Sequence, residues 1–176
     1  MGFSQEDDSE KPEAAWENPV LVIVRGIKYN ESYKMLTGGI CMGSYLNPGN
    51  EAFAVALNSE IYVDKTGLLT YTNKVMNTLQ GYICNSRPRR FGKSFAANML
   101  AAYYSKGCDS RKMFSGLAIS QTADFEKHLN QYDVIHLDIQ WFLSNVSDPE
   151  QIVAYITECT LAELRTIYAD QLPPEV

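Results

Sequence analysis

Apolar side chains recur along the chain with two different periods, which indicates that strands and helices alternate. Apolar and mostly β-branched residues run from Val20 to Val24, and apolar positions dominate Asp133 to Ile139, so both segments are predicted to be strands. Further strand patterns, alternating or short and apolar, occur at 38–46, 53–57, 61–63 and 82–84. The segment 38–46 is expected to pair with the first strand.

Three other segments show the spacing of three and four residues that is typical of amphipathic helices. The first begins at Asp64 or Thr66, either of which could cap it, and runs to about Gln80. The second begins near Ser94, and the third begins at Asp148 before Pro149. Strands that alternate with helices predict an α/β fold with a mainly parallel sheet.

The same pattern limits where the protein can act. The apolar run from Val20 stops at Arg25, far short of the roughly 20 residues that a membrane-spanning helix needs. The first ten residues carry four carboxylates, whereas a secretory signal has a basic and then an apolar stretch. We therefore expect a cytoplasmic protein with no membrane partner.

The net charge of -6 is unevenly distributed. Residues 1–19 hold six carboxylates against one lysine and show no periodicity, which predicts a partly disordered acidic tail. The rest of the chain is nearly neutral, but Arg87, Arg89, Arg90 and Lys93 lie within seven positions. Cations so crowded usually need an anionic partner, so this segment is the first candidate for function.

The cysteines suggest no metal chemistry. Cys41, Cys84, Cys108 and Cys159 are widely separated, include no CxxC pair, and have only two histidines to join them. We expect buried free thiols in a reducing compartment and no structural zinc site.

The segment from Arg87 to Ser94, RPRRFGKS, lacks only the first glycine of the phosphate-binding pattern GxxxxGK(S/T). In such a loop, backbone amides and a helix N-terminus surround a phosphate, the lysine reaches the terminal phosphates, and the hydroxyl binds magnesium. Lys93 is therefore the candidate catalytic cation and Ser94 the candidate metal ligand. The candidates for nucleotide binding are Arg87, Pro88, Arg89, Arg90, Phe91, Gly92, Lys93 and Ser94.

Two interpretations of this loop stay open. Arg87 has a Cβ where the pattern has glycine, and Pro88 favours an extended Arg87, so we expect a reshaped loop entry. Arg89 and Arg90 could clamp phosphate oxygens in a bidentate way. Alternatively, the segment is a basic surface turn whose arginines contact RNA, DNA or a protein partner.

Two segments, IYVDKTGLL at Ile61–Leu69 and ICNSRPRRFGKSFAANMLAAYY at Ile83–Tyr104, resemble the predicted AAA-ATPase-like family of bacterial P-loop proteins. The glycine-poor SRPRRFGKS is that family's own form of the Walker A motif. The resemblance continues through YLNPGN at 45–50 and HLNQYDVIHLDIQ at 128–140, and so covers roughly residue 42 to the end. It implies a three-layer P-loop NTPase-like fold that binds ATP and Mg²⁺.

The resemblance also predicts boundaries. Met42 resembles the family's usual start, so residues 1–41 are expected to be an acidic tail or extension, and 42–176 the N-terminal part of a P-loop AAA-ATPase-like domain. The family's Walker B strand and a PD-(D/E)XK nuclease-like region would both follow residue 176, so the chain is expected to be truncated. Full-length relatives are expected to act with that nuclease-like region or as homo-oligomers.

Four residues are secondary candidates. Asp138 ends a predicted strand, where it could hold magnesium or its water, serve as a polar end group of the sheet, or lie farther away behind the metal's own ligands. Asp64, Lys65 and Thr66 are explained by helix capping with a solvated lysine, whereas the resemblance suggests that they pack near the nucleotide.

These observations predict an ATP-binding P-loop domain that hydrolyses ATP with Mg²⁺. Low activity is expected, because the chain offers no convincing base or water-orienting acid. The competing prediction is a non-catalytic binding module whose arginine-rich loop contacts nucleic acid or a protein partner.

Overall fold

The computed structural model describes residues 20–25, 43–86, 88 and 91–170, and it combines helices with a parallel sheet, in agreement with the predicted α/β class. The predicted acidic tail at 1–19 and the predicted domain start at Met42 lie outside these ranges. In the described ranges, no helix is long and apolar enough to cross a membrane. The elements are β1 Val20–Arg25, α1 Glu51–Leu57, α2 Gly67–Val75, α3 Lys93–Tyr104, α4 Arg111–Phe114, η1 Ala118–Gln121, α5 Phe125–His128, β2 Asp133–Asp138, α6 Ile139–Ser144, η2 Pro149–Gln151 and α7 Ile152–Ile167.

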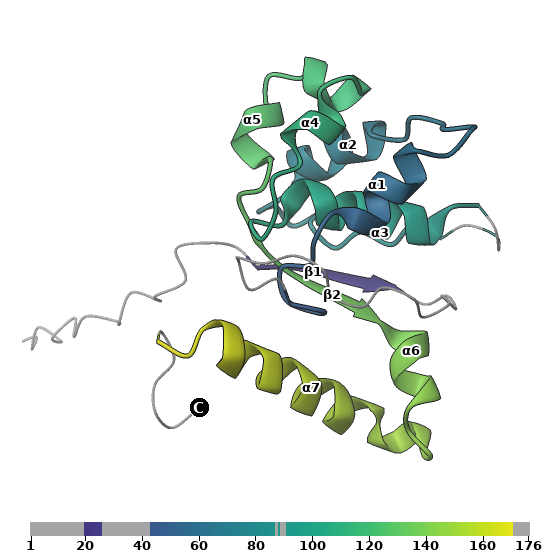
Figure 1. Ribbon diagram of the computed structural model, residues 1–176, viewed down its shortest axis with the longest axis vertical. Helices are drawn as coiled ribbons and strands as arrows, with labels where there is room; N and C mark the ends of the chain where they lie inside the picture. Colours follow the sequence, from purple (N-terminus) through teal and green to yellow (C-terminus); the bar gives the residue numbers. More distant parts are fainter. Residues whose placement is uncertain (1–19, 26–42, 87, 89–90, 171–176) are drawn as a thin grey trace, which may run out of the picture.

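Strands β1 and β2 form a parallel two-stranded sheet between the helices, with Val20 opposite Asp133 (Figure 1). Both strands were predicted and are confirmed. The other edge of β2 is covered by an antiparallel bridge between Leu46 and Ile135. The predicted pairing of 38–46 with the first strand is therefore wrong for its described part, because Leu46 pairs with β2 and not with β1.

Helix α1 stands where the sequence predicted a strand. Phe53 is fully buried and Leu57 packs against the same core, whereas Val55 is 47% exposed. The two inward side chains are four positions apart, which is helical spacing. The Asn50 carbonyl accepts a hydrogen bond from the Ala54 amide at 3.0 Å, which closes the first turn. The alternation of apolar residues with alanines in this segment resembles a strand pattern, although its inward-facing residues have helical spacing.

Two further predicted strands, 61–63 and 82–84, are also wrong. Ile61, Val63 and Tyr82 are 83%, 62% and 97% exposed, and neither segment has strand pairing. Beside β2 there is no free edge for the segment 82–84, because β1 and Leu46 occupy the two edges.

Helix α2 confirms the first predicted helix but ends earlier than expected. It stops at Val75 instead of near Gln80. Asn77 adopts a φ of 60°, and a residue in this left-handed conformation commonly ends a helix. The chain then turns, with the Gly81 amide donating to the Thr78 carbonyl at 3.0 Å.

Helix α3 lies at the centre of the core. Its alanines Ala96, Ala97, Ala101 and Ala102 are buried, as the prediction of close packing against a sheet required. Helices α1, α2, α4 and α5 lie with α3 on one side of the sheet (Figure 1). The fully buried large side chains are Phe53, Leu69, Met99, Tyr103, Tyr104, Phe114, Ile119 and Phe142.

Helices α6 and α7 cover the other side of the sheet (Figure 1). Asp148 and Pro149 begin the last helical segment, as predicted, but as the short turn η2 that leads into α7 at Ile152: Asp148 accepts a hydrogen bond from the Glu150 amide at 3.0 Å. Glu163 in α7 accepts hydrogen bonds from the amides of Tyr45 and Leu46 at 2.8 and 2.9 Å. This carboxylate attaches α7 to the segment that edges β2.

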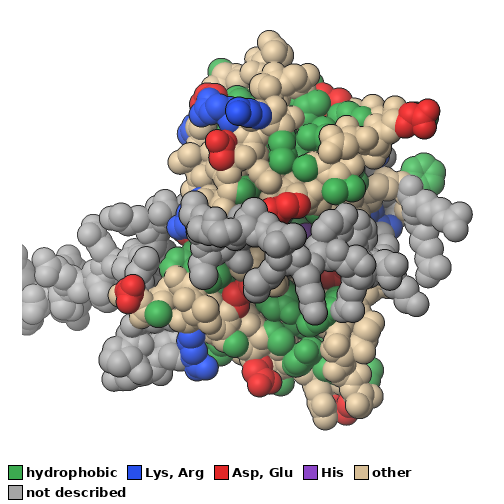
Figure 2. Space-filling model, viewed as in Figure 1, with side chains coloured by type: hydrophobic (Ala, Val, Ile, Leu, Met, Phe, Trp, Pro, Cys, Tyr) green, Lys and Arg blue, Asp and Glu red, His purple; other side chains and the backbone are tan. Residues whose placement is uncertain are grey.

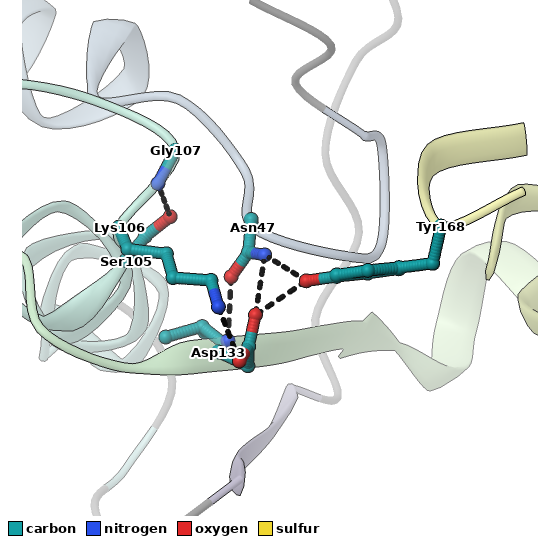
Figure 3. Close-up of polar contacts among 7 residues, drawn as sticks. Asn47, Ser105, Lys106, Gly107, Asp133 and Tyr168 are labelled. Carbon is teal, nitrogen blue, oxygen red and sulfur yellow. Dashed lines mark hydrogen bonds and ion pairs between the residues drawn. The ribbon is translucent and has the colours of Figure 1, made fainter. Parts of the chain in front are cut away.

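A polar network joins four parts of the chain where β2 begins (Figure 3). Asn47 is 5% exposed and has a φ of 47°. Its side-chain amide donates to Asp133 at 2.9 Å and to the Tyr168 hydroxyl at 2.8 Å, and its side-chain oxygen accepts from the Val134 amide at 2.8 Å. Lys106 forms an ion pair with Asp133 at 2.6 Å. The segment before α1, the end of α3, β2 and the end of α7 are thereby held together.

This network predicts a loss of stability in acid. Burial alone would raise the pKa of Asp133, but hydrogen bonds from Lys106, Tyr168 and Asn47 lower it below the usual value. Because the folded-state pKa lies below an unfolded value of about 3.9, ionised Asp133 stabilises the fold above that pH, and this contribution is lost as the pH falls through the folded-state pKa. Urea unfolding of wild type and Asp133→Asn at pH 7 and below pH 4 is the measurement. We expect a smaller acid-induced loss in the variant; equal losses would contradict the prediction.

Candidate phosphate-binding site

The candidate site is built on the first turn of α3. Gly92 precedes the helix with a φ of 77° and a ψ of 30°, a left-handed conformation that suits glycine. Its carbonyl accepts a hydrogen bond from the Ala96 amide at 2.9 Å. The first amides of a helix have no acceptor within the helix, and its dipole makes this end positive. This end of α3 therefore favours an anion.

Lys93 and Ser94 occupy the first two positions of α3, and both are half-buried. The Lys93 amine donates to the Pro88 carbonyl at 3.4 Å, so the side chain turns back over the loop. Pro88 is exposed, and Phe91 is 59% exposed. The described residues of the predicted loop therefore lie together at the N-terminal end of α3. Three predicted residues lie outside the described ranges: Arg87, Arg89 and Arg90.

Asp138 lies at the carboxyl end of β2, toward the same end of the molecule as the first turn of α3. Ser105, which follows α3, forms a bridge with Tyr132, which precedes β2, so α3 ends where β2 begins. The Asp138 carboxylate accepts hydrogen bonds from the Gln140 and Trp141 amides at 3.1 and 3.3 Å. These contacts cap α6, and the roles predicted for Asp138 at the site stay predictions.

Asp64 and Thr66 fasten the start of α2 to η1. The Asp64 carboxylate accepts hydrogen bonds from the Thr66 and Ala118 amides, both at 2.8 Å. The buried Thr66 hydroxyl accepts one from the Ile119 amide at 3.1 Å. Burial would raise the pKa of Asp64, but the hydrogen bonds from Ala118 and Thr66 prevail and lower it. Neither side chain caps α2, so the predicted capping is replaced by a contact with η1.

Lys65 lies between these two fastened residues and reaches the loop. Its amine is 5.7 Å from the centroid of the Phe95 ring. A Cβ added to Gly92 would lie 2.9 Å from the same amine. Of the secondary candidates, Lys65 is therefore the one that the described structure brings against the candidate loop, at Gly92.

Two aromatic residues beside Lys65 were not predicted as site residues. The rings of Tyr62 and Phe95 lie 5.8 Å apart, between the segment before α2 and the first turn of α3. Burial and the charge of Asp64 raise the pKa of Tyr62 to about 12, so its phenol stays protonated at neutral pH. The available sequence signal was their place inside the two segments that carry the family resemblance.

The described ranges offer no ready-made metal cage: they contain no cluster of three or more histidine, cysteine or acidic side chains that could hold an ion. Magnesium usually keeps several waters and binds through few protein groups together with substrate phosphates. The half-buried Ser94 hydroxyl at the anion-favouring end of α3 fits such a shared ion. The prediction of buried thiols is wrong for Cys84, which is exposed because the segment 82–84 lies outside the core.

A family model described as a predicted AAA-ATPase matches residues 51–172, more than half of the chain. The chain belongs to this AAA-ATPase-like family. The predicted resemblance is thereby confirmed, and both Lys65 and the loop before α3 lie inside the matched range. Neither the curated proteins nor the solved structures contain a significant match. Membership of the AAA-ATPase-like family suggests nucleotide binding at the level of the family.

Proposed function

We propose that this AAA-ATPase-like protein binds ATP with Mg²⁺ at the loop 87–94 and hydrolyses it slowly. The observation that carries the proposal is the left-handed Gly92 followed at once by Lys93 and Ser94 in the first turn of α3. Left-handed glycine lets the backbone approach a ligand closely, and the helix end and the lysine supply positive charge at the same place. The family assignment supports this use of the site.

In this proposal each residue acts on the triphosphate. Lys93 is to leave the Pro88 carbonyl and reach the terminal phosphates, where its charge stabilises the transferring group. Ser94 and phosphate oxygens are to hold Mg²⁺, which supplies neutralisation of charge between the phosphates. Arg89 and Arg90 are to contact phosphate oxygens from the loop.

We expect slow turnover because the carboxylates of Asp64 and Asp138 are already engaged in hydrogen bonds with the backbone. Both carboxylate oxygens of Asp64 accept backbone hydrogen bonds, and Asp138 caps α6. We assign neither carboxylate to the orientation of water. On the face in Figure 2, the lysines and arginines among the described residues do not gather into one broad patch, so this face lends little support to the competing nucleic-acid module.

Calorimetric titration of ATP with and without Mg²⁺ tests the proposal. We expect wild type to bind ATP in a metal-dependent way, and Lys93→Ala to weaken binding by about 10- to 30-fold, because a charge-assisted contact contributes about 1.5–2 kcal/mol. Lys112→Ala removes an exposed lysine in α4 and is the matched control. Equal and metal-independent binding by wild type and Lys93→Ala would refute the proposal. Binding of single-stranded DNA that weakens steeply with salt would favour the competing module.

A further inference from the structure

We infer that Lys65 is a second phosphate-binding cation and that the cavity beside it receives the base of the nucleotide. This inference rests on the proposed nucleotide site and adds to it a binding pocket and a specificity surface. It assigns the segment before α2, outside the phosphate-binding loop, to recognition of the nucleoside.

The position of Lys65 calls for an anion. Its amine approaches Gly92, the residue that precedes Lys93, at the positive end of α3. Among the described residues, no carboxylate lies within ion-pair distance of this amine. A cation near a helix N-terminus and the lysine that follows Gly92 meets a repulsion that water and salt screen only in part, and negative charge between them removes it. A triphosphate would supply that charge.

The chain holds Lys65 in place from both sides. Asp64 is fixed by the amides of Thr66 and Ala118, and Thr66 is fixed by the amide of Ile119. These contacts restrain the backbone that carries Lys65 while leaving its side chain exposed toward the loop. A restrained backbone lowers the entropy cost of ordering the lysine on a ligand.

A cavity of about 370 Å³ opens next to Lys65 and Gly92, within the range of roughly 300–1,000 Å³ that is usual for ligand pockets. Most of its wall residues are apolar or aromatic, with Phe91 and Ile61 59% and 83% exposed, and polar atoms contribute about as much of the open wall as apolar atoms do. The Tyr62 hydroxyl is buried and has no hydrogen-bond partner among the described residues. A wall that combines aromatic rings with polar atoms suits a flat heterocycle with polar edges. Its wall residues include Ala56, Ser59, Ile61, Tyr62, Phe91 and Phe95.

A larger cavity, about 640 Å³, is a poorer candidate for the base. It lies among β1, α2, α3 and the segment 81–85, and its walls include Leu21, Ile23 and Leu100. It touches the phosphate site at Lys93 but includes neither Gly92 nor Lys65. A nucleotide with phosphates between Lys65 and Lys93 would therefore place its base in the smaller cavity.

Calorimetry with two probes, ATP and inorganic tripolyphosphate, each with Mg²⁺, separates the two parts of the inference. Lys65→Ala is expected to weaken binding of both probes about tenfold, because the lysine contacts phosphate. Ala56→Leu fills the cavity and is expected to weaken ATP at least tenfold while leaving tripolyphosphate unchanged. Ala52→Leu, at an exposed position of the same helix outside the cavity walls, is the matched control. Ser59→Leu, at an exposed wall position, repeats the test should Ala56→Leu fail to fold.

The outcomes distinguish this inference from the proposed function. ATP binding that depends on Lys93 but is unchanged in Lys65→Ala and in the cavity variants would overturn the inference alone. Equal loss of ATP and tripolyphosphate in correctly folded cavity variants would overturn the base pocket. Failure of wild type to bind either probe would overturn both the pocket and the proposed function.

Discussion

Replacing Asn47 with alanine is expected to lower the free energy of unfolding by about 2–5 kcal/mol. The side chain makes three hydrogen bonds in a nearly buried setting, to Asp133, Tyr168 and Val134. Leaving a buried polar group without its partner costs about 1–3 kcal/mol, and alanine at the φ of 47° adds about 1–2 kcal/mol. Urea unfolding followed by circular dichroism is the measurement.

Two variants separate the causes of that loss. Asn47→Gly keeps the left-handed backbone available but removes the side chain, so it should be more stable than Asn47→Ala by about 1–2 kcal/mol. Tyr168→Phe removes only the hydroxyl that accepts from Asn47 and should cost less than either. The network adjoins the beginning of β2, away from Gly92, so folded Asn47→Ala should keep its affinity for ATP. A cost below about 1 kcal/mol for Asn47→Ala would contradict the assigned role.

The strong local patterns predicted the elements that organise the fold. Val20–Val24 and Asp133–Ile139 became β1 and β2, and the helices after Ser94 and Asp148 became α3 and α7. Their pairing was not predictable from those patterns. The parallel contact between Val20 and Asp133 joins residues far apart in the chain, and it left no edge of β2 for the segment 82–84.

The prediction failed for short segments whose apolar residues fit both the strand period and the helix period. Phe53, Val55 and Leu57 alternate as in a strand, yet only Phe53 and Leu57 face the core. Alanines between them satisfy either period because they bury little area, so tertiary packing decided in favour of a helix. The preceding turn at 47–50 supplied the start of that helix.

In the candidate site, too, the local motif was predictable from the sequence and the tertiary contact was not. RPRRFGKS located Lys93 and Ser94, because the spacing of the phosphate-binding pattern is local to one turn and one helix start. The approach of Lys65 to Gly92 is tertiary and follows from the packing of α2, η1 and α3. The sequence could name Asp64, Lys65 and Thr66 together, but only the structure separates one cation facing the loop from two residues fastened to η1.

Replacing Gly92 with valine is expected to reduce affinity for both ATP and tripolyphosphate by about 100-fold, equivalent to about 2.7 kcal/mol. The φ of 77° is costly for any residue with a Cβ and most costly for a β-branched one. The added Cβ would also lie 2.9 Å from the Lys65 amine and displace it. The substitution therefore disturbs the first turn of α3 and the second cation together, and calorimetry with both probes measures the result.

Gly116→Ala is the matched control for Gly92→Val, because a Cβ added at Gly116 meets nothing within 4 Å. We expect that control to bind both probes as wild type does. Gly92→Ala adds the Cβ without the branch and should fall between the two, since its clash with Lys65 is relieved by movement of a flexible side chain. If Gly92→Val folds and binds ATP within about threefold of wild type, then the left-handed turn before α3 does not receive the phosphates, since a contact there is worth more than the roughly 0.6 kcal/mol lost.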